Sequence, residues 1–138
     1  GLFILVVLFL PGGLVSVPHP FSRNRLNHIR REALERTAGT VDLVEVFNAR
    51  ELTGAQNRRA AAWAVAHGIA VAAGSDAHRT FELGHAWLEM DDFDGPAAFL
   101  AAARRGLVHG RLTGPLVHVL TRYDKLMNRL APRVPSAS

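Results

Sequence analysis

The chain alternates between continuous apolar runs and stretches in which apolar residues recur every three or four positions. A continuous run is typical of a strand buried on both faces, and the second spacing is typical of an amphipathic helix. We therefore expect strands at residues 14–17, 41–47, 69–73, 85–90 and 107–109, and helices that begin near residues 26, 53, 94 and 116. In the last helix we expect Leu120, Tyr123, Leu126 and Met127 to point inward.

Three of the predicted helices stop at a glycine, namely Gly39, Gly68 and Gly106, and an apolar run follows each within a few residues. A strand, a helix, a glycine and a further strand in this order are typical of βα units with a parallel sheet. The predicted fold class is α/β. We expect one domain over residues 1–131 and a short tail at residues 132–138.

Residues 1–10 are an uninterrupted apolar run without an initiating methionine. The run is too short to span a membrane, which takes about 20 residues, and no basic segment precedes it as in a signal peptide. We expect a buried strand here, in a fragment or a processed product. The hypothesis that the protein is secreted or membrane-anchored depends on this apolar run alone. We therefore expect a cytoplasmic location and no membrane partner.

The composition limits the chemistry. The chain has no cysteine, so disulfides and thiolate metal sites are excluded, and any metal must be held by His, Asp or Glu. Of the 16 basic residues all but Lys125 are arginine, and the net charge is +4. Two interpretations of the excess of arginine stay open. It reflects genomic composition bias, or it provides a surface for phosphate-bearing ligands, which arginine binds in a bidentate fork. The arginines are spread along the chain, which weakens the case for a dedicated nucleic-acid stripe.

Candidate site residues follow three of the predicted strands. In a parallel sheet the carboxyl ends of strands lie at one edge, where functional groups gather. Asp76 and His78 follow one strand on a tight turn, and together they suit Zn, Mn or Fe; the alternative is that Asp76 caps the next turn and His78 is merely exposed. His19 follows another strand and lies between two prolines, which restrict its backbone and would hold its imidazole in place. The alternative is a histidine at a strand end without a role.

The strand at residues 41–47 offers weaker candidates. Its alternation places Asn48 on the side of Val44 and Val46, as a residue that hydrogen-bonds substrate or ligands. Glu45 would point the other way unless the strand twists or bulges, and we interpret it as structural. Arg23, Arg25 and Arg50 lie in loops after these strands and are candidate phosphate-binding residues or solvated surface charge. His85 is a further candidate near the same edge.

Four segments in this order resemble the PHP (polymerase and histidinol phosphatase) family of metal-dependent phosphoesterases. They are VSVPHPF at residues 15–21, VDLVEVFNAR at 41–50, AAGSDAH at 72–78 and ELGHAW at 82–87. The resemblance implies the C-terminal part of a distorted, TIM-like (β/α) barrel with parallel strands. It implies divalent metal ions as cofactors (Zn, Mn or Mg, two or three in a complete site) with His19, Asp76 and His78 at metal-ligand positions. It also implies a small phosphorylated substrate or a nucleotide, with nucleic acid as an alternative partner.

The chain departs from the family pattern in two respects. Residues 1–10 run into Pro11-Gly12-Gly13 with little room for the helix that the family has before the His-Pro strand. The family opens with an H-x-H pair and supplies a further Glu and His before the His-Pro strand, whereas no two histidines of this chain are two positions apart. Two functions therefore remain open. The first is a phosphoesterase represented by a fragment with weak activity or none, and the second is a non-catalytic accessory module such as those attached to DNA polymerases.

Overall fold

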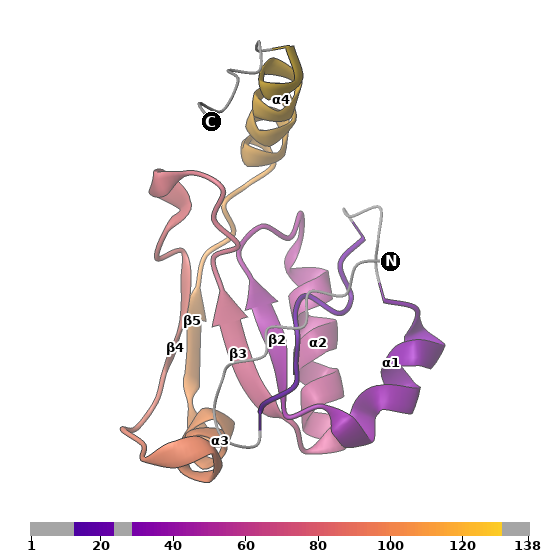
Figure 1. Ribbon diagram of the computed structural model, residues 1–138, viewed down its shortest axis with the longest axis vertical. Helices are drawn as coiled ribbons and strands as arrows, with labels where there is room; N and C mark the ends of the chain where they lie inside the picture. The colour runs from indigo at the N-terminus through magenta and orange to yellow at the C-terminus, as the bar shows by residue number, and fades with distance from the viewer. Residues whose placement is uncertain (1–12, 24–28, 131–138) are drawn as a thin grey trace, which may run out of the picture.

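The computed structural model describes residues 13–23 and 29–130 (Figure 1). Its strands are β1 (Ser16–Val17), β2 (Leu43–Asn48), β3 (Ala70–Gly74), β4 (Ala86–Glu89) and β5 (Leu107–Gly110). Its helices are α1 (Arg31–Thr37), α2 (Gly54–His67), α3 (Gly95–Arg105) and α4 (Leu116–Leu130), with short 3-10 helices η1 (Ala38–Thr40) and η2 (Thr80–Glu82). The predicted strand at residues 1–10, the predicted tail and Arg25 lie outside the described residues.

The predicted parallel sheet is confirmed. β1 pairs with β2 and β2 pairs with β3, both in parallel, and the order of the strands is β1-β2-β3. The predicted strands at residues 85–90 and 107–109 are also present as β4 and β5, which form an antiparallel pair of their own. The fold is thus mixed α/β. The strands among the described residues do not close into a barrel, so the TIM-like part of the expectation is not confirmed.

Local signals position α2 and α3 as predicted. The hydroxyl of Thr53 accepts a hydrogen bond from the amide of Ala55 at the start of α2, and Gly68 ends this helix with a left-handed φ of 63°. α3 follows Asp94 and carries a proline in its first turn. α1 differs from the prediction because it begins only at Arg31. Ile29 packs against the core from a non-helical segment, so apolar spacing there reflects burial without a helix.

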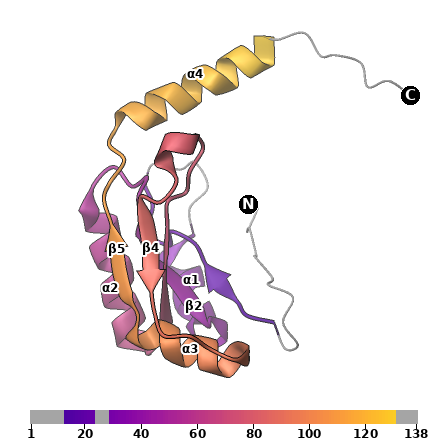
Figure 2. The same cartoon turned by 90° about the vertical axis from the view of Figure 1, so that its left-hand side faces the viewer.

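Two apolar clusters lie on opposite faces of the parallel sheet. Alternation along β2 directs Val44 to one cluster and Leu43 to the other. The first cluster joins the sheet to α1 and α2 through Leu34 and Trp63, and the second joins it to α3 through Ala103. Figures 1 and 2 show α3 at one end of the molecule, and the carboxyl ends of β2 and β3 point toward the other, where α4 lies.

The expected inward position is wrong for Tyr123, Leu126 and Met127 of α4, whereas Leu120 is half-buried. The exposed apolar side chains of α4 are Leu116, Val119, Tyr123, Leu126 and Met127, each between 46% and 66% accessible. α4 contacts the rest of the chain through a different face, on which Val117 is buried. An amphipathic pattern shows that a helix has an apolar face but does not show what that face packs against. No helix among the described residues is long and apolar enough to cross a membrane.

We expect Leu34→Ala to lower the free energy of unfolding by about 2–5 kcal/mol, because Leu34 is 1% exposed and its removal leaves a cavity between α1 and the sheet. Urea denaturation measures the change. Val65→Ala is the control, since Val65 is 82% exposed and its replacement should change stability by less than about 0.5 kcal/mol. Equal effects of the two substitutions would contradict this packing.

Candidate functional site

The carboxyl ends of β1, β2 and β3 bring four of the polar residues together. The carboxylate of Glu45 accepts a hydrogen bond from the backbone amide of His19 at 2.8 Å. The side-chain amide of Asn48 donates to both Glu45 oxygens, at 3.3 and 3.2 Å, and to Asp76 Oδ2 at 3.3 Å. Three strand ends that are far apart in sequence are therefore linked by one chain of hydrogen bonds, as the parallel arrangement predicts.

A register shift in β2 explains why Glu45 belongs to this group. Glu45 pairs with Ala72, but Phe47 pairs with Ala73 and Asn48 with Gly74, so Val46 is an extra residue in β2. Ala72 and Gly74 are two positions apart and face the same way. Their partners Glu45 and Asn48 therefore share a face although they are three positions apart. The sequence predicts that Glu45 points the other way unless the strand twists or bulges, and the bulge in β2 places it on the side of Asn48.

Gly74 provides room for the Glu45 side chain. A Cβ atom built on Gly74 would overlap the Glu45 carboxylate. The absence of a side chain at this position thus allows Glu45 to reach forward between the ends of β1 and β3. Asn48, by contrast, is only 1% exposed, and its Oδ1 accepts the backbone amide of Arg50. The side chain of Asn48 thus serves to connect Glu45, Asp76 and the following loop.

His19 and Asp76 share an unusual backbone conformation. They have positive φ angles of 30° and 50°, and no other non-glycine residue among those described does. Such conformations are sparsely populated for residues with a side chain, cluster at functional sites, and persist only where the surroundings hold them in place. Here two of the three candidate ligands have this conformation, at the ends of two different strands.

His78 is oriented by its own turn. Its Nδ1 lies 2.8 Å from the backbone oxygen of Asp76. Because a carbonyl oxygen only accepts, Nδ1 carries the proton and the lone pair remains on Nε2, which is the usual arrangement in a histidine that binds a metal. His78 is exposed, so this nitrogen is accessible from solvent.

The donor types therefore fit a divalent ion, but the arrangement does not amount to a formed site. Among residues 13–23 and 29–130, no three His, Asp or Glu side chains form a group that could hold a metal. The roles of His19, Asp76 and His78 as ligands stay a prediction.

Glu82 and Arg50 form a buried pair beneath the His78 turn. They are 0% and 4% exposed, and the guanidinium of Arg50 donates to Glu82 Oε1. Glu82 Oε2 accepts the backbone amides of His78 and Arg79, each at 2.8 Å. The side chain of Arg50 is thus buried and oriented by protein groups, and its role in phosphate binding stays a prediction. The burial of Glu82 was not anticipated from the ELGHAW segment.

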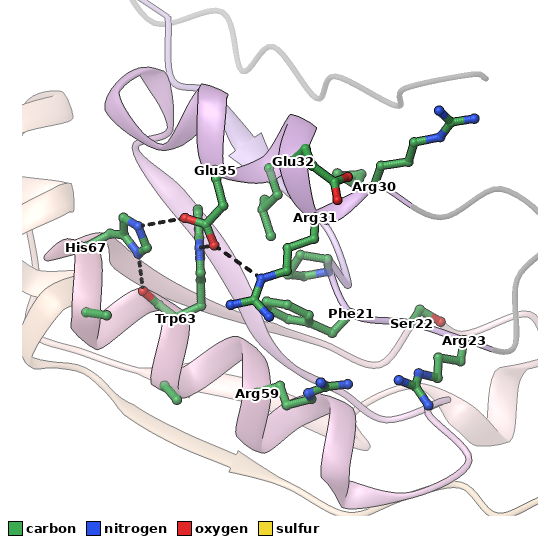
Figure 3. A pocket seen from close by; sticks show the side chains of 15 residues that line it. Phe21, Ser22, Arg23, Arg30, Arg31, Glu32, Glu35, Arg59, Trp63 and His67 are labelled. Carbon is green, nitrogen blue, oxygen red and sulfur yellow. Dashed lines mark hydrogen bonds and ion pairs between the residues drawn. The ribbon is translucent and has the colours of Figure 1, made fainter.

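Arg23 lies on a separate groove. The groove has a volume of about 670 Å³ and lies between the loop after β1, α1 and α2 (Figure 3). Arg30, Arg31 and Arg59 also line it, and at its far end Glu35 contacts both Trp63 Nε1 and His67 Nε2. Arg23 is exposed there and makes no described contact with the residues at the strand ends. The side chain of His85 contacts Arg111, whose guanidinium lies 3.0 Å from His85 Nε2.

Two comparisons with known proteins bear on this arrangement. The family model described as PHP-associated matches residues 54–108. This part of the chain is thus similar to PHP-associated segments. It contains α2, β3, the turn with Asp76 and His78, Glu82, β4 and α3, and it does not include His19 or Glu45. The resemblance noted in the sequence is thus confirmed for the part of the PHP-like pattern that follows β2.

The chain is also similar to the uncharacterized protein MJ0417 of Methanocaldococcus jannaschii. The two are 35% identical over 86 residues, which are 60% of this chain and 36% of that protein. The chain thus spans about a third of the length of this relative.

We expect Gly74→Ala to displace the Glu45 carboxylate and so to remove its hydrogen bond to the His19 amide. A hydrogen bond to a charged group contributes about 1.5–3 kcal/mol, so the protection of this amide against hydrogen exchange should fall roughly ten-fold or more. Gly39→Ala is the control, because nothing lies within 4 Å of a Cβ atom built there. Unchanged protection at His19 in Gly74→Ala would contradict the described role of Gly74.

Proposed function

We propose that this chain provides the C-terminal part of a metal-dependent phosphoesterase site of the PHP type. The observation that carries the proposal is the hydrogen-bonded chain His19–Glu45–Asn48–Asp76 at the carboxyl ends of three parallel strands. Its support from sequence is the PHP-associated match over the segment that contains Asp76 and His78. The positive φ angles of His19 and Asp76 support a site at which the backbone is held for function.

In this proposal His19, Asp76 and His78 hold divalent ions, and Glu45 is a further carboxylate at the same edge. A bound ion would lower the pKa of a coordinated water and neutralise charge on the phosphoryl group. The protein's own contribution is orientation. Asn48 holds the carboxylates of Glu45 and Asp76 near one another, and the Asp76 carbonyl fixes the His78 tautomer. Carboxylate oxygens and imidazole nitrogens are ligand types that Zn, Mn and Fe accept.

The substrate class that we propose is a phosphoric ester, with a small phosphorylated molecule or a nucleotide preferred. The accessory module is the competing function, and the two differ in whether metal binding is followed by turnover. Further ligands from the family's H-x-H segment would complete the site, since affinity depends on the number of ligands and on the groups that orient them.

We expect Asp76→Asn to weaken Mn²⁺ binding by roughly ten-fold or more, since it removes a charged ligand. Asparagine tolerates a positive φ, so the turn should keep its conformation. Isothermal titration calorimetry gives the affinity. Asp91→Asn is the matched control, because Asp91 is exposed and its pair with Arg105, at 3.5 Å, is exposed as well. Equal affinity of Asp76→Asn and the unmodified chain would remove Asp76 from the proposed metal site.

We expect the 138-residue chain to hydrolyse p-nitrophenyl phosphate weakly or not at all in the presence of Mn²⁺, because three predicted ligands are fewer than the family site uses. The measurement is release of p-nitrophenol, with EDTA as the control for metal dependence. Rapid turnover that EDTA abolishes would show that the chain holds a sufficient site by itself.

A further inference from the structure

The His78 turn is connected to α4 by two separate sets of contacts. The first is direct. Arg79, next to His78, pairs with Asp124 of α4 through three donor–acceptor distances of 3.0, 2.6 and 2.7 Å. Two guanidinium nitrogens thus contact two carboxylate oxygens, which is the bidentate geometry of strong arginine pairs. Both side chains are partly exposed, at 33% and 42%.

The second set runs through the buried pair. Arg50 Nη2 donates to Thr121 Oγ1 at 2.8 Å and to the backbone oxygen of Val117 at 3.4 Å, both in α4. Arg50 Nη1 donates to Glu82, and Glu82 in turn accepts the amides of His78 and Arg79. One guanidinium therefore joins α4 to the carboxylate that holds the turn.

Both carboxylate oxygens of Glu82 are used, so a substitution at Glu82 would affect both Arg50 and the His78 turn. One oxygen accepts Arg50 and the other accepts two backbone amides. Glu82 is fully buried, and an unpaired buried charge is costly, so removal of Arg50 would leave the Glu82 carboxylate without its charged partner. A carboxylate accepts at both oxygens, whereas an amide side chain accepts at only one.

We propose that Glu82 and Arg50 are positioning residues that make the Asp76–His78 turn depend on the position of α4. When α4 is attached, Arg50 holds Glu82, and Glu82 holds the amide of His78. When α4 is detached, Arg50 loses the Thr121 and Val117 acceptors, Arg79 loses Asp124, and the turn loosens. This inference rests on the proposed function for its effect on metal affinity, although the coupling itself concerns the chain alone.

The most direct test replaces Glu82 by glutamine in the full chain. Glu82→Gln keeps the volume but sets an NH₂ group either against Arg50 or against the two backbone amides. We expect Mn²⁺ affinity to fall about 10–100-fold, as for other groups that orient metal ligands. Exchange of the His78 amide in the metal-free chain should become faster.

The second test acts from α4, in case Glu82→Gln does not fold. Thr121→Val combined with Asp124→Asn removes side-chain acceptors from both sets of contacts and leaves Glu82 unchanged. We expect a weaker Mn²⁺ affinity, by several-fold, and faster exchange at the His78 and Arg79 amides. Thr121→Ser is the matched control, because it keeps the hydroxyl that accepts Arg50 and should behave as the unmodified chain. Asp91→Asn serves as a control for loss of a surface charge.

The two readouts separate the two proposals. If the unmodified chain binds no Mn²⁺, the proposed function fails, and amide exchange in the metal-free chain still decides the coupling. If the α4 double variant is folded and both its Mn²⁺ affinity and its His78 and Arg79 exchange rates match those of Thr121→Ser, the coupling is overturned. Faster exchange in the double variant alone, with Thr121→Ser unchanged, supports it.

Discussion

One extra residue in β2 determines which side chains meet at the end of the sheet. Because Val46 has no partner of its own in β3, Glu45 and Asn48 face the same way, and the amide of Asn48 reaches two carboxylates at once. Without the bulge, Asn48 would share a face with Val44 and Val46 and would point into the apolar contact with α2. Burial of a polar amide there without partners would cost free energy.

The same end of the sheet is supported from two sides. On one side Asn57 of α2 binds the backbone at the end of β2. Its side chain accepts a hydrogen bond from the backbone amide of Asn48 at 3.1 Å and donates one to the backbone oxygen of Asn48 at 3.2 Å. On the other side the buried Arg50–Glu82 pair supports the turn that follows β3. The candidate ligands thus lie on loops. Behind them, Asn57 and Glu82 belong to the helices α2 and η2, and Arg50 lies in the turn after β2.

The sequence was sufficient for features that depend on local signals. Thr53 and Gly68 predicted both ends of α2. Continuous apolar runs predicted β1, β2 and β3, and their alternation with helices and glycines predicted that they are parallel. Features that depend on distant partners were missed. The bulge at Val46 follows from pairing with β3, the burial of Glu82 follows from Arg50, and the exposure of Tyr123 and Leu126 follows from which face of α4 finds polar partners. None of these partners is near in sequence.

The positive φ angles of His19 and Asp76 limit what substitution experiments can reveal about these positions. A branched residue such as valine would strain the backbone as well as remove the donor atom, so a loss of binding could not be assigned to chemistry. Asparagine accepts this conformation most readily after glycine and also keeps a similar shape to aspartate. The backbone itself therefore restricts the residues that evolution, or an experimenter, can exchange at these two strand ends without rebuilding the turn.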